Sequence, residues 1–155
     1  MILVAVGASH IPFDRLMRAL DGADFAEPLV VQHGPSAVRP PNARLLEFAP
    51  AQELAALVRE ASAVVTHAGV GSILLALTNG KRPFVVPRLG AHGETVDDHQ
   101  LESARRFSAA GLVTLVEDPA DLPAAIAAPR ETLSMERGEP RLVAELRSYV
   151  TEVVG

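Results

Sequence analysis

Short apolar runs alternate with longer helical patterns along the chain, and this alternation constrains the fold more than any other feature. The runs are rich in aliphatic residues and lie at 2–6, 29–32, 44–48, 63–67, 83–87 and 112–116. Several are apolar at consecutive positions, as in parallel strands that helices cover on both faces. Helices are expected between them, at about 12–20, 51–61, 72–79, 97–110 and 119–127. The alternation predicts an α/β fold with a single Rossmann-like, doubly wound parallel sheet of about six strands.

One domain is expected to span 1–155, because a chain of 155 residues suits a single hydrophobic core. A last helix is expected at about 140–153. Its apolar residues form a broad stripe: Leu142, Val143, Leu146, Tyr149, Val150 and Val153. The linker-like segment 129–140 would connect this helix to the rest of the domain.

Charge and composition exclude several classes of function. The net charge of −5 argues against a surface that binds nucleic acid. The absence of cysteine excludes a disulfide framework, a cysteine nucleophile and thiolate metal sites. No apolar stretch approaches the roughly 20 residues that cross a bilayer, and the first residues lack the basic segment of a signal peptide. We therefore expect a soluble, cytoplasmic protein.

Three loops at the carboxyl ends of the predicted strands have unusual sequences, and ligands of such sheets bind at this edge. They are 6–14, 67–72 and 86–100. None completes the G-x-G-x-x-G fingerprint of dinucleotide sites, and Gly80-Lys81-Arg82 lacks the other residues of a P-loop. Ordinary NAD and ATP sites are therefore disfavoured.

The turn after the fourth strand has two interpretations. Gly69, Gly71 and Ser72 open a predicted helix, where free N–H groups and the helix dipole favour an anion such as phosphate. His67, just before the turn, could donate to the same anion. Alternatively, the glycines shape a tight turn and Ser72 is the N-cap. Sequence pattern alone leaves both interpretations open.

The loop before the 97–110 helix is also ambiguous. Asp97 and Gln100 have the spacing of a capping box, with Asp97 as the N-cap. His92, Asp97, Asp98 and His99 include possible metal ligands, but their crowding is not a recognised ligand spacing. A serine hydrolase is disfavoured, since no G-x-S-x-G elbow is present.

Taken together, these loops resemble a known family. The chain is similar to the small, soluble subunit of two-component UDP-sugar glycosyltransferases, which belong with the C-terminal-domain proteins of glycosyltransferase family 28. The bacterial exopolysaccharide enzymes are the nearer branch, and the soluble subunit of the dolichol-linked N-acetylglucosaminyltransferase is related. The resemblance rests on the ordered segments MILVAVGASHIPFDRLMRALD, EFAP, VVTHAGVGSILLALTNGKRPFVVPR and DDHQLESARRFSAAGLV.

The resemblance implies a role for each loop. His67 and the amides of Gly69, Gly71 and Ser72 would hold the UDP diphosphate. Gln100, with His99, would bind hydroxyls of the transferred sugar. The transfer would invert the anomeric centre without a metal or another cofactor, with the UDP-sugar as donor substrate. A helix N-terminus and a donor side chain would stabilise the charge on departing UDP.

In relatives the first loop faces the reaction cleft, so Gly7 and Ser9 are expected there. His10 is the candidate catalytic residue, as the general base that an inverting transfer needs on the acceptor hydroxyl. Two positions depart from the family pattern. Leu75 stands where relatives often carry a glutamate that binds the ribose, and VGAS replaces the VGTH of many bacterial relatives, with His10 one place further on.

The resemblance also implies partners. GT-B transferases have two Rossmann-like domains, and this chain would supply only the donor half. The acceptor half would be a membrane-associated subunit with a lipid-linked sugar acceptor, which recruits this chain to the inner face of the membrane. The last helix and 129–140 would form the docking surface, unless that helix packs on its own sheet. A non-catalytic nucleotide-sugar-binding regulatory module is the alternative function, and a related epimerase or hydrolase is a third.

Overall fold

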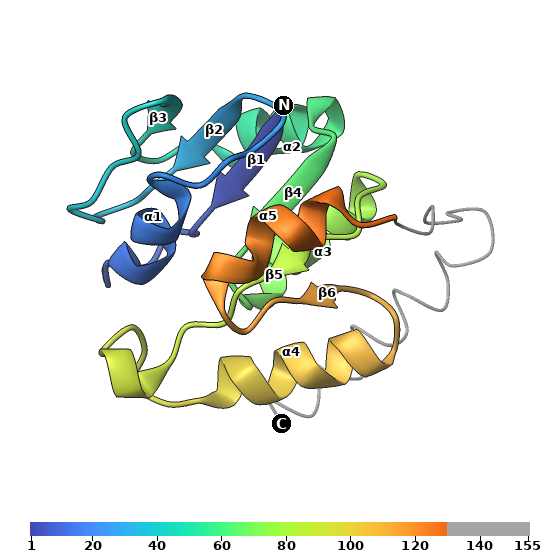
Figure 1. The fold of residues 1–155 in the computed structure, drawn as a ribbon. Helices are drawn as coiled ribbons and strands as arrows, with labels where there is room; N and C mark the ends of the chain where they lie inside the picture. The colour runs from blue at the N-terminus through green and yellow to red at the C-terminus, as the bar shows by residue number, and fades with distance from the viewer. Residues whose placement is uncertain (130–155) are drawn as a thin grey trace.

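The computed structural model describes residues 1–129, which form one six-stranded parallel sheet (Figure 1). The strand order is β3-β2-β1-β4-β5-β6, and every neighbouring pair is parallel. The strands are β1 (Ile2–Ala5), β2 (Leu29–Gln32), β3 (Ala43–Leu46), β4 (Ala63–Thr66), β5 (Phe84–Val85) and β6 (Thr114–Leu115). The predicted fold class is confirmed. The helix expected at 140–153 and residues 130–140 before it lie outside the described residues.

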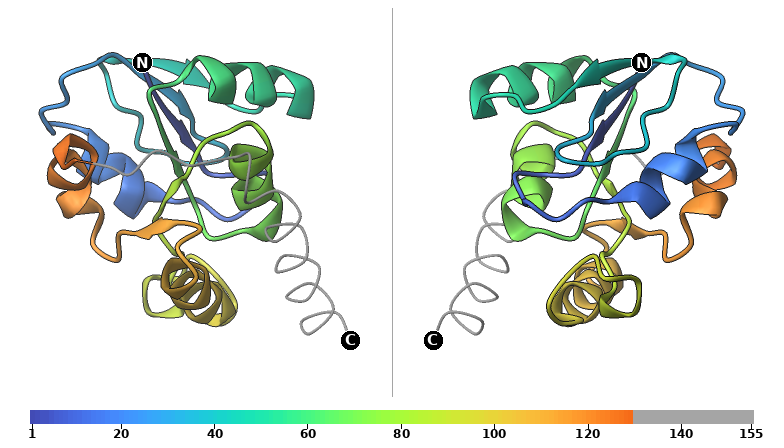
Figure 2. Two further views of the ribbon diagram at one scale, coloured as in Figure 1. Left: turned by 90° about the vertical axis from the view of Figure 1, so that its right-hand side faces the viewer. Right: turned by 90° about the vertical axis from the view of Figure 1, so that its left-hand side faces the viewer.

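Helices cover both faces of the sheet, as the doubly wound prediction requires. They are α1 (Asp14–Leu20), α2 (Ala51–Glu60), α3 (Val70–Thr78), α4 (His99–Ala109) and α5 (Leu122–Ala127), with 3-10 turns η1 (Gly90–His92) and η2 (Pro119–Asp121). Figure 2 shows α1 and α5 on one side of the sheet and α2 and α3 on the other. The α4 helix packs beside α3, where Phe107 joins Ile73 and Leu77 in one apolar cluster.

The consecutive apolar residues of the strands pack into hydrophobic clusters on both faces of the sheet. Ile2 and Val4 of β1 pack into the cluster under α1 and α5, whereas Leu3, between them, packs under α2 and α3. All three side chains are buried. Successive side chains of a strand point to opposite faces, so a sheet covered on both sides needs apolar residues at every position. This packing explains why the runs do not alternate with polar residues.

Two helix starts differ from the predictions. The α3 helix begins at Val70 with Gly69 as N-cap, so Ser72 lies inside the first turn and is not the N-cap. Asp98, not Asp97, is the N-cap of α4, so the expected capping box does not form. The carboxylate of Asp97 instead accepts from the amide of His99, two residues on, at 3.0 Å. Local side-chain bonds of this kind compete with regular capping.

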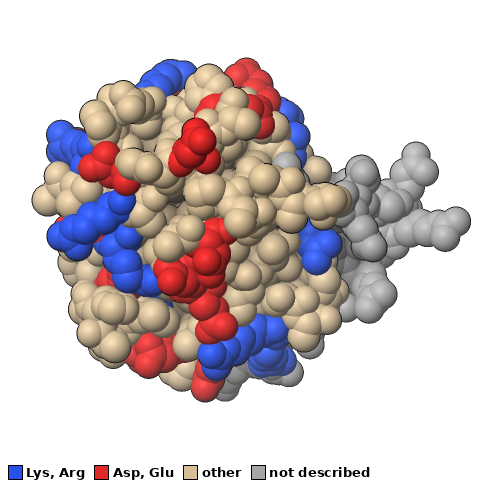
Figure 3. Space-filling model, viewed as in Figure 1, with Lys and Arg blue, Asp and Glu red and all other residues tan. Residues whose placement is uncertain are grey.

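Acidic and basic side chains are interspersed on the face of the molecule shown in Figure 3, which is the face of Figure 1. Within residues 1–129, none of the helices combines the length and the apolar character needed to cross a bilayer.

Candidate functional site

The imidazole of His67 lies against two glycines, Gly7 and Gly69, which come from different loops. Gly7, after β1, has φ +82°, and a Cβ added there would collide with Nε2 of His67. A Cβ on Gly69 would collide with Cε1 of the same ring. Gly7 therefore combines a left-handed backbone, which favours glycine, with a close approach that only glycine permits. The two glycines leave the ring the space it occupies.

Two hydrogen bonds fix the orientation of the His67 ring. The amide of Gly69 donates to Nδ1 at 3.2 Å, and Nε2 lies 3.1 Å from Oγ of Ser72. Because Nδ1 accepts, a neutral ring must carry its proton on Nε2 and donate it toward Ser72. Ser72 thus sits beside the donor atom of His67.

Burial keeps the His67 ring uncharged at neutral pH. Desolvation by the surrounding protein and, to a smaller extent, the positive charge of Arg88 together lower the pKa of His67 to about 4. The side chain of Gln100 acts in the opposite direction. His67 therefore offers a neutral N–H donor rather than a cation across the physiological range.

The first turn of α3 carries the free backbone donors of the site. The N–H groups of Val70, Gly71 and Ser72 have no carbonyl one turn earlier in the helix to bond. A Cβ on Gly71 would meet no atom within 4 Å, and its φ is not positive, so open space lies beside these amides. Since the amide of Gly69 is engaged by His67, the available donors begin at Val70. The geometry suits a bound anion.

Of the two residues predicted to bind the sugar, the structure brings only Gln100 to His67. Oε1 of Gln100 is buried and has no hydrogen-bond partner in the described part of the chain, yet it lies close enough to the imidazole to favour its protonated form. His99 is exposed and lies 3.9 Å from the carboxylates of Asp97 and Glu102. Gln100 therefore offers an unused acceptor beside the ring.

The polar residues of the first loop are arranged more loosely. Oγ of Ser9 accepts from the amide of Ile11 at 3.1 Å, a bond within the loop itself. His10 is exposed. No hydrogen bond joins either of them to His67 within residues 1–129.

The sequence of residues 1–136 matches the C-terminal domain of glycosyltransferase family 28. The chain belongs to this family. No curated protein matches it.

Solved glycosyltransferases share the fold of this family 28 domain. The calicheamicin glycosyltransferase CalG4 is 18% identical with a TM-score of 0.57, covering 99% of this chain and 44% of that one. The glycosyltransferase of kitacinnamycin is 22% identical with a TM-score of 0.56, and the match covers 95% of this chain and 39% of that one. The glycosyltransferase SnogD from Streptomyces nogalater is 22% identical with a TM-score of 0.57, and the match covers 97% of this chain and 39% of that one. The chain thus spans less than half the length of these structures.

Gln32, which the sequence reasoning missed, holds the first loop of the family 28 domain in place. Its Oε1 accepts from the amides of Val6 and Gly7, both at 3.1 Å. Its Nε2 donates to the carbonyl of Gly7 at 3.1 Å and to that of Glu47 at 2.9 Å. All hydrogen-bonding positions of a buried amide are thus used to set the backbone that faces His67. Its one sequence signal is a polar residue at the end of an apolar strand.

Arg88 and Glu94 were also missed. Both are buried, with 2% and 4% exposure, in the loop between β5 and α4. Fully buried charges are rare, so their location was not predictable from composition. Arg88 is the arginine of the VVPR segment. That segment supported the resemblance to the family but indicated no role for this side chain.

Leu75 lies in an apolar part of the site. Together with Leu54 and Val58 of α2, it lines a hollow of about 30 Å³ that also touches Gly7 and Ser72. A carboxylate at this position would face aliphatic side chains. Aliphatic side chains therefore surround the position where the family pattern has a glutamate, although Gln32, Thr66 and Ser72 also line the hollow.

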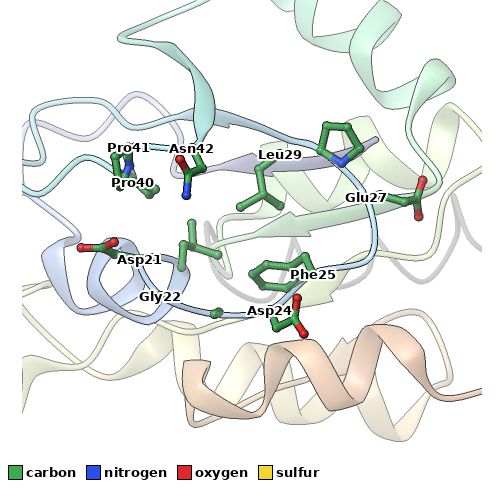
Figure 4. A pocket seen from close by; sticks show the side chains of 12 residues that line it. Asp21, Gly22, Asp24, Phe25, Glu27, Leu29, Pro40, Pro41 and Asn42 are labelled. Carbon is green, nitrogen blue, oxygen red and sulfur yellow. The ribbon is translucent and has the colours of Figure 1, made fainter.

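A separate hollow lies at the amino ends of the strands. It has a volume of about 460 Å³. In Figure 4, Phe25 and Leu29 point toward its middle, while the carboxylates of Asp21 and Glu27 point outward. None of the predicted site residues lines it. In residues 1–129, no three His, Asp or Glu side chains gather as metal ligands would.

Proposed function

We propose that this chain is the donor-binding part of an inverting UDP-sugar glycosyltransferase, with the UDP diphosphate at the start of α3. One observation carries the proposal: the free amides of Val70, Gly71 and Ser72 lie beside open space at Gly71, and His67 holds its Nε2–H against Oγ of Ser72 in the same turn. The family match supports a nucleotide-sugar ligand.

The arrangement suits a leaving group that gains negative charge. As the glycosidic bond to UDP breaks, charge develops on the phosphate oxygens, and the N-terminus of α3 carries a partial positive charge of roughly half a unit. The neutral Nε2–H of His67, held by Ser72 in the free chain, would add a donor by turning from that hydroxyl to a phosphate oxygen. These groups would stabilise departing UDP without a metal. His10 is the candidate general base on this chain.

Gln100 is proposed to bind the transferred sugar. Its buried, unpartnered Oε1 beside His67 can accept a hydrogen bond from a sugar hydroxyl. A buried acceptor left unbonded costs free energy that such a hydroxyl would recover. His99, exposed at the start of α4, is the weaker candidate.

The acceptor half is proposed to be a second, membrane-associated polypeptide that presents a lipid-linked sugar in exopolysaccharide synthesis, at the cytoplasmic face of the membrane. The solved glycosyltransferases are more than twice as long as their matching part. Two exposed apolar side chains lie in loops at the carboxyl edge: Phe48 is 53% exposed and Val96 is 94% exposed. They are candidate contacts for that partner.

Calorimetric titration with UDP tests the proposed site, with Gly71→Val as the decisive variant. Valine at this position meets no protein atom at its Cβ and demands no unusual backbone, so the domain should stay folded. Its side chain fills the space assigned to phosphate, so we expect UDP binding to fall at least tenfold. A variant that binds UDP as well as the wild type would place the nucleotide elsewhere, and absence of UDP binding by the wild type, alone and with its partner, would end the proposal.

A non-catalytic regulatory module is the second candidate function, and the apolar setting of Leu75 favours it. Without the expected glutamate, the ribose must be held by other groups. A donor screen for UDP release, with partner subunit and membrane extract present, separates the two functions. UDP binding without release under any condition would favour regulation.

A further inference from the structure

Arg88 joins the two loops that flank the His67 turn. Its guanidinium donates to the carbonyl of Ile11 at 2.9 Å and to that of Val6 at 3.1 Å, both in the first loop. It also donates to the backbone carbonyl of Glu94 at 3.3 Å, in the loop that leads to α4. One buried side chain therefore fixes the backbone on either side of the candidate site.

A compact cluster of charges surrounds this side chain. The guanidinium of Arg88 lies 4.8 Å from the ring centroid of Phe13, and that of Arg15 lies 5.6 Å from the same centroid. Arg15 forms an ion pair with the buried carboxylate of Glu94 at 3.1 Å. That carboxylate also accepts from the amide of Leu89 at 3.1 Å. The carboxylate of Glu94 thus pairs with Arg15 and acts on Arg88 through its charge, so these three side chains together carry one net positive charge.

We propose that Arg88 is a positioning residue of the donor site, which locks the first loop against the loop that leads to Gln100 and places a buried positive charge beside His67. This inference rests on the proposed function. A buried charge is costly, and an uncharged side chain could brace a loop at lower cost. The excess positive charge is useful where a diphosphate binds.

The effect of Arg88 on His67 gives independent support. The groups that face the imidazole are Gly7 from the first loop, Ser72 from α3 and Gln100 from α4, and none of these is charged. The positive charge of Arg88 is the one that lowers the pKa of His67. It therefore helps to keep the ring a neutral donor on Nε2.

Two substitutions separate the charge from the geometry. Arg88→Met removes both the charge and the hydrogen bonds, whereas Arg88→Lys keeps the charge and loses the planar fork that reaches several carbonyls. Arg105→Met is the matched control, because Arg105 is exposed on α4 and forms an ion pair with Glu117, at 2.8 Å, away from the His67 turn. For each variant, the pKa of His67 is measured by NMR titration, and UDP affinity by calorimetry. Amide hydrogen exchange is followed at Gly7 and Ile11.

Both Arg88 variants should bind UDP at least tenfold more weakly and exchange the two loop amides faster than the wild type. The pKa of His67 should rise in Arg88→Met but stay below its ordinary value of about 6.5, because burial still lowers it. It should stay low in Arg88→Lys, while Arg105→Met should match the wild type throughout. If Arg88→Met does not fold, the affinity and exchange of Arg88→Lys decide the question.

Wild-type UDP affinity in a folded Arg88 variant would overturn the inference and leave the proposed function intact. Failure of both variants to fold would also overturn it, since Arg88 would then serve the fold alone. If the wild type binds no UDP, the proposed function fails. The titration of His67 and the exchange of the loop amides then decide whether Arg88 positions this site: an unchanged pKa in Arg88→Met, or unchanged exchange, overturns the inference.

Discussion

The amino and carboxyl edges of the sheet differ in the polar side chains that they bury. A hollow of about 460 Å³ lies at the amino edge, with Phe25 and Leu29 toward its middle. At the carboxyl edge, the hollow beside Leu75 measures about 30 Å³, and another, lined in part by Arg15, Arg18 and Glu94, measures about 430 Å³. Yet the carboxyl edge holds the buried polar groups, among them Gln32 and Arg88. Converging polar groups, rather than the volume of a hollow, therefore mark the site in this domain.

The direction of the strands explains the difference. In a parallel sheet with crossover helices, the helices that follow the strands begin at the carboxyl edge and direct their free amides there. The amino edge receives helix C-termini, which carry partial negative charge. The hollow at that edge is lined in part by three acidic residues: Asp21, Asp24 and Glu27. An anionic ligand is therefore favoured at one edge and opposed at the other.

The largest loss is expected from Gly69→Ala. The backbone of Gly69, with φ −71° and ψ 133°, accepts alanine, but the added Cβ collides with the His67 ring and drives it from its place. The displaced ring loses its donor geometry and would approach the free amides of α3. We expect UDP affinity to fall on the order of 10³-fold, since oxyanion-type donors act only when correctly placed. Calorimetry measures the effect.

Gly71→Ala is the matched control for this change, because a methyl group there touches no protein atom. The NMR signals of His67 should shift in Gly69→Ala and stay constant in Gly71→Ala. An unshifted ring in Gly69→Ala would mean that the close packing of His67 does not hold in solution.

The second prediction removes the His67 side chain alone. His67→Ala should reduce sugar transfer, assayed with the partner subunit, on the order of 10²-fold, as for loss of one charge-stabilising donor. The fold should change little, because the two hydrogen bonds that fix the ring lie within its own turn. Full activity in this variant would mean that the turn from His67 to Ser72 is purely structural. The proposed functional difference between the two edges would then be wrong.

Much of this edge was predictable because it is built from local sequence. The strand that ends before His67, the glycine turn and the α3 helix all follow from hydrophobic pattern and turn chemistry. The exact helix start was missed because Ser72 bonds the imidazole instead of capping the helix. Arg88 could not be assigned a role, since its partners Ile11 and Val6 lie 77 and 82 positions away. Contacts of that range are fixed only by the folded sheet.

The third prediction concerns pH. The pKa of His67 is lowered from about 6.5 to about 4 in the folded chain, so the unfolded chain binds more protons between these values. This contribution to stability is present above pH 6.5 and is lost as the pH falls toward 4. At pH 5 we expect a loss of about 2 kcal/mol relative to pH 7.5. Urea unfolding of the wild type and His67→Asn at both pH values isolates the contribution of His67 to the free energy of unfolding. Equal losses of stability in the two proteins would contradict this prediction.

The smallest effect is expected at the amino edge. Asp24 is exposed and lines the large hollow, far in the fold from the start of α3. Asp24→Asn removes one negative charge there, and screening by salt leaves little of its field at the other edge. UDP affinity should change by less than about twofold at physiological ionic strength, by the same screening argument. A tenfold change would mean that the hollow at the amino edge contributes to nucleotide binding, and the division of the domain into a chemical edge and an inert edge would be wrong.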